Sequence, residues 1–321
     1  MNKNVRKFIK NFALVLIIAI VVIIIINKLI NKFSNMKEHL STDNGKYYNW
    51  RYGEIFYTKK GKGSPVLLIH DLHPASSGYE WNRVISRLSE KHTVYTLDIL
   101  GCGRSEKPNL TYTNYMYVQL VNDFIANIIG EKTDVIATGA SSSFVIMACQ
   151  MESKYYKKII AVSPEDIYKL AQSPTKTSNI LKYLLEMPVI GSLIYNILMS
   201  KNGILDMMVG NYYHKDHLVS DKLLLTYYHS AHLGDGNGKY LLSSINSNYT
   251  NVNVIPALKR VNNSIILVTG KEHEFMSEIA EDYVSFNPAI EVVDIPQTKY
   301  LPHLEAPDKF LSTLEILLET K

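Results

Sequence analysis

Apolar and polar positions along the chain predict buried strands that alternate with helices. Six short apolar runs have the length of buried strands and are bounded by glycine, proline or polar residues: 65–70, 93–98, 134–138, 158–162, 264–269 and 290–295. Helical spacing occurs at 79–90, 114–129, 144–151, 276–284 and 307–318. A β-hairpin is predicted in front, because aromatic and polar residues alternate at 48–52 and 54–58 around Gly53. This order predicts an α/β fold with a mostly parallel, doubly wound sheet.

A long segment, residues 164–260, interrupts this alternation. It contains helical patterns at 180–185, 193–198 and 221–229 joined by polar loops. A structureless loop of that length is rare inside a compact domain. We therefore predict a helical cap over a core formed by residues 47–163 and 261–321. Tyrosine and methionine side chains of this cap either line a substrate cavity or fill its interior, as such residues mostly do; the candidates are Met207, Met208, Tyr227 and Tyr228.

The N-terminus carries an unbroken apolar run at residues 12–26, which extends to 8–30 across a few polar positions. Such a run approaches the ~20 residues that span a bilayer. A cleaved signal peptide is the alternative, but its apolar region is usually shorter and ends in a small-x-small site. We predict an uncleaved transmembrane anchor at 1–33 and a polar tether at 34–46. The globular domain is expected outside the cytoplasmic membrane, although lysines on both sides of the run make the bias in orientation weak.

Composition adds limits to this picture. The chain has 321 residues, of which 46% are hydrophobic, and a net charge of +4, much of it near the N-terminus, so nothing argues for a nucleic-acid partner. Cys102 and Cys149 lie in or beside predicted core elements and lack C-x-x-C spacing, which argues against a disulfide or a metal site. The sequence has no nucleotide- or metal-binding motif, and we expect no cofactor.

The stretch Gly139-Ala-Ser-Ser-Ser143 joins a predicted buried strand to a predicted helix. A tight turn of small residues lifts Ser141 out of the sheet at the helix N-terminus, where free N–H groups favour negative charge. This is the layout of a nucleophile elbow, in which the N–H of Ser142 helps to hold an oxyanion. A serine that only caps the helix would give a similar pattern.

Five motifs in chain order resemble those of the α/β-hydrolase superfamily, over about residues 48–320. They are His70-Asp-Leu-His73, Asp98-Ile-Leu-Gly-Cys-Gly-Arg-Ser105, Gly139 to Ser143, Val268-Thr-Gly-Lys-Glu-His-Glu274 and Leu301-Pro-His-Leu-Glu-Ala-Pro307. The resemblance implies acyl-transfer chemistry in which Ser141 is the nucleophile and the N–H groups of Leu72 and Ser142 form the oxyanion hole. It also implies a histidine base oriented by a carboxylate.

The position of the expected base is occupied by Tyr300. A phenol with a pKa near ~10 is a poor base at neutral pH, although it can donate a hydrogen bond to an oxyanion or a leaving group. His303 lies three residues on and could reach Ser141 only after a loop rearrangement. His70 and His73 lie at the same edge of the sheet and are further candidates. His70 more often holds the oxyanion turn by hydrogen bonding.

The expected acid is displaced as well. His273 stands at the aspartate position of the resemblance, and its neighbours Glu272 and Glu274 could replace that aspartate or be solvated loop charges. Glu165 and Asp166, directly after an earlier strand, offer a second option.

Asp71 is a third departure, since the superfamily usually has glycine after the histidine of the oxyanion turn. A carboxylate beside a developing negative charge is unfavourable unless it points away or pairs with Arg104. Ser143 in place of glycine is a milder change, because serine still allows close packing of strand and helix.

Three functions are open at this point. The first is a membrane-anchored serine hydrolase that acts on an ester, thioester or amide of a small apolar or lipid-like substrate, with the bilayer as a partner through residues 8–30. Its expected catalytic residues are Ser141, Glu272, His303 and Tyr300. The second is a catalytically silent binding or scaffolding module that keeps the fold. The third is an enzyme of another reaction, such as C–C bond cleavage or proton transfer, with Tyr300 as the acid.

Overall fold

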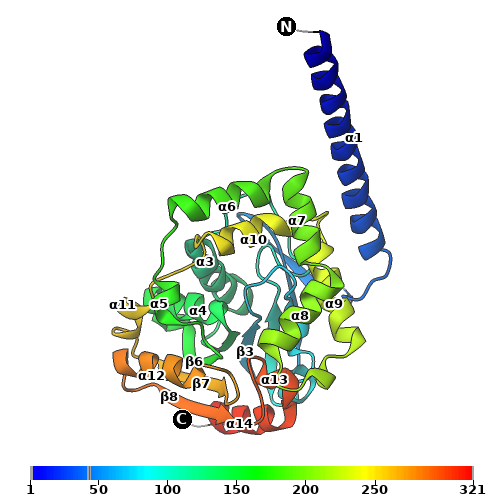
Figure 1. The fold of residues 1–321 in the computed structure, drawn as a ribbon. Coiled ribbons are helices and arrows are strands. Elements are labelled where there is room, and N and C mark those ends of the chain that lie inside the picture. The colour runs from blue at the N-terminus through cyan, green and yellow to red at the C-terminus, as the bar shows by residue number, and fades with distance from the viewer. Residues whose placement is uncertain (1–2, 42, 44, 320–321) are drawn as a thin grey trace.

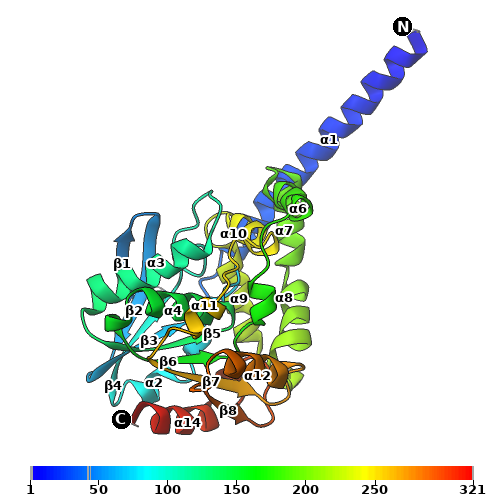
Figure 2. The same ribbon diagram turned by 90° about the vertical axis from the view of Figure 1, so that its left-hand side faces the viewer.

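An eight-stranded sheet forms the centre of the computed structural model, which describes residues 3–41, 43 and 45–319 (Figure 1, Figure 2). The strands are β1 (Gly45–Trp50), β2 (Gly53–Lys60), β3 (Ser64–Ile69), β4 (His92–Leu97), β5 (Thr133–Thr138), β6 (Tyr156–Val162), β7 (Ser264–Gly270) and β8 (Glu291–Ile295). Their order is β1-β2-β4-β3-β5-β6-β7-β8. β1 pairs antiparallel with β2, and β2 with β4, while every other pair is parallel. The predicted hairpin and the doubly wound α/β sheet are confirmed.

The described residues also form α-helices which, apart from α1, cover both faces of the sheet and fill the segment between β6 and β7 (Figure 1). They are α1 (Lys3–Ser34), α2 (Ile85–Leu88), α3 (Asn114–Phe124), α4 (Ala140–Met151), α5 (Ile167–Leu170), α6 (Lys176–Glu186), α7 (Ile190–Leu198), α8 (Lys201–Met207), α9 (Asp221–His232), α10 (Gly238–Asn246), α11 (Ile255–Leu258), α12 (Met276–Phe286), α13 (Pro302–Glu305) and α14 (Pro307–Glu319). The helix predicted at 79–90 is wrong. The chain instead forms a 3₁₀ turn at Gly78–Trp81 and the single turn of α2, and this path buries Trp81, Val84 and Leu88 against the sheet.

Side chains of each strand alternate between the two faces of the sheet, so that each face has its own core. Leu67 and Ile69 of β3 pack in the cluster that contains α3, α4 and α12. Val66 and Leu68 face the other side, where Trp81 and α14 cover them. Strands buried on both faces need nearly continuous apolar sequence, which explains the runs that predicted them.

Helices α5 to α11 occupy the segment where a cap is predicted, and α6, α7 and α9 correspond to its three expected helical patterns. Met208 and Tyr227 are buried in a cluster that the cap shares with Ala75, Leu301 and Leu304 of the α/β core. Met207 and Tyr228 are partly buried and pack against the same cluster. Met208 and Tyr227 therefore fill the interior between cap and core, and Met207 and Tyr228 lie at its margin.

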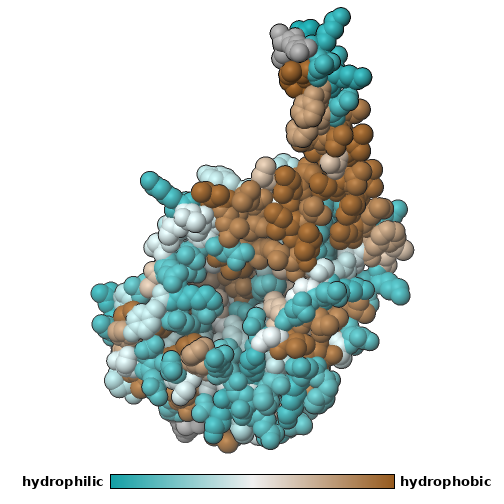
Figure 3. Space-filling model, viewed as in Figure 1, coloured by the Kyte–Doolittle hydropathy of each residue, from teal (hydrophilic) through white to brown (hydrophobic). Residues whose placement is uncertain are grey.

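Helix α1 stands out from the body, and its 32 residues are long and apolar enough to cross a membrane (Figure 1). A signal sequence near the N-terminus can also meet this criterion of length and apolar composition. Figure 3 shows an apolar column along α1 that continues onto the adjoining part of the cap. The segment predicted as a tether packs on the cap at its start, because Leu40 is buried and the N–H groups of His39 and Leu40 donate to His229 Nδ1.

Candidate active site

Strand β5 runs directly into α4 through Gly139, which has the geometry of a sharp elbow. Its φ of +54° is a left-handed conformation that glycine adopts without a steric penalty. A Cβ at this position would lie 2.0 Å from the Tyr300 hydroxyl and 2.3 Å from Asp71 Oδ1. Glycine is therefore needed for both conformation and space. The turn brings Tyr300 and Asp71 to Gly139 and Ala140, at the start of α4. The expectation that the turn lifts Ser141 out at its apex is wrong, because Gly139 is the apex and Ser141 is buried as the second residue of α4.

Ser141 has 1% of its surface exposed, and its Oγ has no hydrogen-bond partner among the described residues. None of the described residues places an imidazole or a carboxylate within hydrogen-bonding reach of this hydroxyl. The next two serines differ, because Ser142 Oγ donates to Gly139 O and Ser143 Oγ to Ala140 O, each at 2.6 Å. A buried hydroxyl without a partner costs about 1–3 kcal/mol. The hydroxyls of Thr138 and Ser163 are in the same state, so the missing partner alone does not identify Ser141 as a nucleophile.

The carboxylate of Asp71 covers the main-chain donors next to this elbow. Its Oδ1 accepts hydrogen bonds from the N–H groups of Leu72 at 2.8 Å and Ala140 at 3.1 Å. Its Oδ2 accepts from the Tyr212 hydroxyl at 3.3 Å. The Leu72 N–H, expected as an oxyanion donor, is thus already bound to an anion of the protein itself.

The second expected donor is the N–H of Ser142. It donates to the carbonyl of Gly139 at 3.1 Å, within the first turn of α4. Both expected donors therefore have internal acceptors in this conformation. An oxyanion at Leu72 would have to displace the carboxylate of Asp71.

The protonation of Asp71 depends on its surroundings. Burial, followed by the neighbouring carboxylates of Glu80 and Glu165, raises the pKa of Asp71 from 3.8 to about 7. Hydrogen bonds from Leu72 and Ala140 oppose this rise. A carboxyl group with such a pKa exchanges its proton near neutral pH, which suits a general base.

Arg104 does not neutralise Asp71, so that alternative is wrong. Its Nε lies 2.8 Å from Asp98 Oδ2, and its Nη2 lies 3.0 Å from Asp98 Oδ1. Burial opposes ionisation of Asp98, but the guanidinium of Arg104 outweighs it and holds the pKa of Asp98 below its usual value. This ion pair fixes the glycine-rich loop after β4 instead.

Tyr300 stands where the resemblance places a histidine. Its ring stacks on that of Tyr212, with 5.1 Å between the centroids. Burial, followed by the carboxylates of Asp71 and Glu165, raises the pKa of Tyr300 well above its usual value. The phenol therefore stays protonated and can donate a hydrogen bond, but it cannot serve as a base at neutral pH.

His303 belongs to a buried pair behind the oxyanion turn. It stacks on Trp81 with 4.2 Å between ring centroids, and its Nε2 lies 3.4 Å from Glu80 Oε1. Glu80 Oε2 accepts the N–H of Asp71 at 3.3 Å. The structure thus links His303 to Asp71 through Glu80, and not to the hydroxyl of Ser141. Glu80 was missed from the sequence, because a glutamate in a predicted surface helix reads as a solvated charge.

His70 and His73 hold loops in place. His70 Nδ1 donates to Asp71 O at 2.7 Å, and its Nε2 accepts from the N–H of Ile99 at 3.2 Å. His73 Nδ1 accepts from the N–H of Ala75 at 3.2 Å. Burial lowers the pKa of both imidazoles, that of His73 to about 4. Neither ring is hydrogen-bonded to the candidate nucleophile.

Two of the four candidate acids, Glu272 and Glu274, are exposed in the loop after β7. His273 lies between them, and its ring centroid is 5.7 Å from that of Tyr300. Burial lowers the pKa of His273. His273, at the position of the expected aspartate, thus places a neutral imidazole near Tyr300, and the carboxylates of Glu272 and Glu274 are exposed to solvent.

The other two candidate acids follow β6. Asp166 caps α5 by accepting the N–H of Tyr168 at 2.7 Å. Glu165 pairs with Lys169 at 2.8 Å, and its charge raises the pKa of Asp71. Of the four, Glu165 is the one whose charge acts on Asp71.

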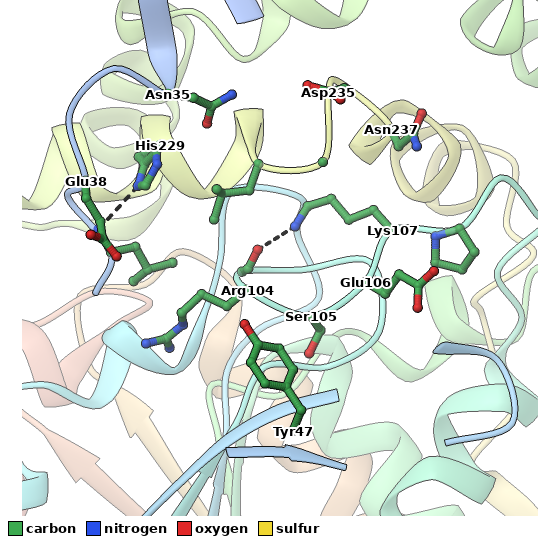
Figure 4. Close-up of a pocket in the computed structure, with 15 residues that line it drawn as sticks. Asn35, Glu38, Tyr47, Arg104, Ser105, Glu106, Lys107, His229, Asp235 and Asn237 are labelled. Carbon is green, nitrogen blue, oxygen red and sulfur yellow. Dashed lines mark hydrogen bonds between the residues drawn. The ribbon is translucent and has the colours of Figure 1, made fainter. Parts of the chain in front are cut away.

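A cavity of about 860 Å³ opens between the end of α1, the loop after β4 and the turn between α9 and α10 (Figure 4). Its polar lining includes Asn35, Glu38, Tyr47, Arg104, Glu106, Lys107, His229 and Asp235. Lys107 is buried and donates from Nζ to Gly103 O at 2.5 Å, and burial lowers the pKa of Lys107 to about 8. Ser141 does not line this cavity, which is therefore no route to the candidate nucleophile.

A sequence profile described as the alpha/beta hydrolase family matches residues 66–313. The chain belongs to the α/β-hydrolase family. Among solved structures, this α/β-hydrolase is similar to a serine hydrolase involved in carbazole degradation, with a TM-score of 0.69 at 17% identity, covering 86% of this chain and 99% of that one. It is also similar to the enol-lactonase from Burkholderia xenovorans LB400, with a TM-score of 0.67 at 12% identity, covering 86% of this chain and 100% of that one. At these identities the likeness shows the fold alone.

Among curated proteins, this α/β-hydrolase is 38% identical over 73 residues to the 2-hydroxy-6-oxo-6-(2'-aminophenyl)hexa-2,4-dienoic acid hydrolase of Metapseudomonas resinovorans. The match covers 22% of this chain and 25% of that protein, so the chain spans about a quarter of the relative's length. The named relative is a hydrolase. This chain has glycine at the bend of the elbow, but Tyr300 occupies the position where the resemblance expects the histidine base.

Proposed function

We propose that this α/β-hydrolase is a membrane-anchored hydrolase with Ser141 as its nucleophile. Its substrate would be a small apolar or lipid-like ester, thioester or amide. The observation that carries the proposal is the carboxylate of Asp71, which has a pKa of about 7 and covers the Leu72 N–H beside the elbow. Relatives named as hydrolases support hydrolysis as the reaction class.

Asp71 would serve as the base. Rotation of its side chain away from Leu72 and Ala140 brings a proton acceptor towards Ser141 and frees an oxyanion donor in the same movement. Ser141 Oγ then loses its proton to Asp71 as it bonds to the acyl carbon. The N–H groups of Leu72 and Ala140, which Asp71 releases, hold the oxyanion, because the Ser142 N–H expected for this role stays bonded to Gly139 O. The proton passes from Asp71 to the leaving group as its bond to the acyl carbon breaks. Water then gives a proton to Asp71 as its oxygen bonds to the acyl carbon. The bond from the acyl carbon to Ser141 Oγ breaks, and Asp71 returns the proton to Oγ.

Tyr300 would assist departure of the leaving group. Its hydroxyl lies at the elbow, close to the space that a Cβ of Gly139 would fill. Because its raised pKa keeps it protonated, the phenol is a hydrogen-bond donor at every step. The same property is compatible with acid catalysis of another bond cleavage. No feature of the site favours that reaction over acyl transfer.

A catalytically silent binding module is the second candidate. The observation that favours it is the burial of Ser141. The residue is 1% exposed, and its hydroxyl has no base within hydrogen-bonding reach among the described residues. In that case Asp71 would cap the main-chain donors permanently, and the fold would serve only to bind.

Labelling by a fluorophosphonate probe separates the two candidates. The full-length protein is treated in vesicles, and the modified residue is located by peptide mass. A hydrolase is labelled at Ser141, and Ser141→Ala abolishes the labelling. Ser143→Ala is the matched control, since this neighbour's hydroxyl is tied to Ala140 O and its removal should leave labelling in place. Folded wild-type protein that is not labelled would overturn the hydrolase and leave the binding module.

A further inference from the structure

The outer face of the α6–α7 hairpin is apolar and exposed. We call it the hairpin face; its residues are Ile180, Leu181, Tyr183, Leu184, Met187, Ile190, Ile197 and Leu198. The most exposed are Tyr183 at 70% and Ile180 and Ile197 at 62% each. Exposed apolar residues are ordinary when they are scattered, but a contiguous group of this size marks a contact surface.

The polarity of α6 is the reverse of that of a helix on a water-facing surface. Its charged pair, Lys182 and Glu186, is 2.7 Å apart and faces the protein, with side-chain exposures of 12% and 21%. Glu186 Oε1 also accepts a hydrogen bond from Ser243 Oγ of α10 at 2.8 Å. Charged side chains of a soluble cap would normally lie on the outer face. Here this pair is turned inward and the aliphatic side chains outward, and the exposed charge of α6 is Lys176 in its first turn.

The hairpin is also firmly built. The two helices meet at 95°. Gly191 allows their close approach, since a Cβ there would lie 2.1 Å from the carbonyl oxygen of Leu185. Tyr195 of α7 is buried, and its hydroxyl donates to Ala231 O of α9 at 2.6 Å. The hairpin face is therefore displayed by a packed element.

Helix α1 meets the cap at this hairpin. Asn27 Nδ2 donates to Val189 O at 3.1 Å, and Asn196 Nδ2 donates to Asn27 Oδ1 at 2.9 Å. The apolar part of α1 ends just before this contact. From Phe8 to Ile26 the helix rises roughly 27 Å, close to the ~30 Å thickness of a hydrocarbon core. The edge of the bilayer would therefore lie level with the bend of the hairpin.

We propose that the hairpin face docks into the lipid bilayer, in the leaflet where the C-terminal end of α1 emerges. Figure 3 shows the apolar surface of α1 continuing without a break onto this part of the cap. We therefore expect lipid to cover the hairpin face, because the bilayer that α1 crosses would lie directly against it. This inference uses the proposed anchor and is independent of the chemistry at Ser141. The protein would then contact the membrane through α1 and through the hairpin face, and the α/β core would lie on the side of the cap that faces away from the bilayer.

Site-directed spin labelling of the full-length protein in vesicles of phosphatidylcholine and phosphatidylglycerol tests this. Nitroxides are attached to Ile180→Cys and Ile197→Cys, while Cys102 and Cys149 are buried and wild-type protein gives the background. Ile18→Cys in α1 reports the anchor. Ile316→Cys is the matched control, since this residue is 69% exposed on α14, at the opposite end of the molecule from α1 (Figure 1).

Docking predicts that nitroxides at 180 and 197 collide more with oxygen than with a water-soluble nickel chelate. The label at 316 should show the reverse preference. Labels at 180 and 197 that behave like the one at 316 would overturn the proposal. Spin–spin broadening that grows with the protein-to-lipid ratio would also overturn it, because a second copy would then cover the face. The label at 18 tests the anchor separately, and none of these signals depends on whether Ser141 reacts.

Discussion

Asp71 Oδ1 lies 2.8 Å from the main-chain nitrogen of Leu72, so the anion that blocks the oxyanion donor belongs to the same turn. A hydrogen bond to a charged acceptor contributes about 1.5–3 kcal/mol, and a substrate must replace it before the donor can act. The resting site is therefore closed by its own candidate base. In the proposed mechanism, one rotation of the Asp71 side chain both frees the Leu72 N–H and brings the base to Ser141.

Replacing the carboxylate by a carboxamide tests the role of Asp71 as a base. Asp71→Asn keeps an oxygen that can accept from Leu72, but the amide cannot take a proton. Labelling of Ser141 by a fluorophosphonate should slow by about 10²- to 10⁴-fold, the usual contribution of a general base. The second-order rate, measured by intact mass on protein with an unchanged melting temperature, checks this. A rate equal to that of the wild type would remove Asp71 from the mechanism.

Restoring the residues expected from the family resemblance should create an ordinary site. Asp71→Gly frees the N–H groups of Leu72 and Ala140, and adding Tyr300→His supplies an imidazole at the elbow. The double variant should be labelled about 10²-fold faster than Asp71→Gly alone, because it regains a base. Asp71→Gly with Tyr300→Phe is the matched control and should show no gain. Equal rates in the two double variants would mean that position 300 does not face Ser141.

Stability should change with pH through Asp71. Its pKa in the folded chain is about 7, above its ordinary 3.8, so the folded state binds more protons than the unfolded state between these values. The free energy of unfolding therefore falls as pH rises through that window. Asn does not titrate. The free energy of unfolding of Asp71→Asn, relative to that of the wild type, should therefore increase from about pH 4 to about pH 7 by at most about 4 kcal/mol. Urea unfolding across this range measures it, and a constant difference would contradict the raised pKa.

Gly139→Ala should be strongly destabilising. The left-handed φ penalises a side chain, and the added Cβ would overlap Tyr300 and Asp71. We expect a loss of about 2–4 kcal/mol in the free energy of unfolding. Gly210→Ala is the control, because a Cβ there meets nothing within 4 Å, and it should cost less than about 0.5 kcal/mol. Similar costs at the two positions, measured by urea unfolding, would exclude steric crowding at the elbow.

Most of the sheet could be predicted from the sequence because strand burial is a local pattern. The run before Gly139 and the small residues after it also predicted the sharp turn of β5 into α4. Glu80 could not be found in this way. The apolar spacing around it reads as one helix, whereas the chain makes two separate turns that bury this carboxylate beside His303.

The closure of the site by Asp71 was beyond the reach of sequence reasoning. It depends on the turns after β3 and β5 meeting so closely that one carboxylate reaches both Leu72 and Ala140. The hairpin face was hidden for a different reason. An amphipathic pattern such as that of α6 does not say which face is turned outward, and only the inward position of Lys182 and Glu186 reveals it.

The pH dependence of Ser141 labelling tests the central claim most directly. If Asp71 is the base, the labelling rate of the wild-type protein should rise with pH to a plateau with a midpoint near its pKa of about 7. The rate of Asp71→Asn should be low and flat across the same range. A wild-type rate that does not change with pH, or the same midpoint in both proteins, would contradict the account.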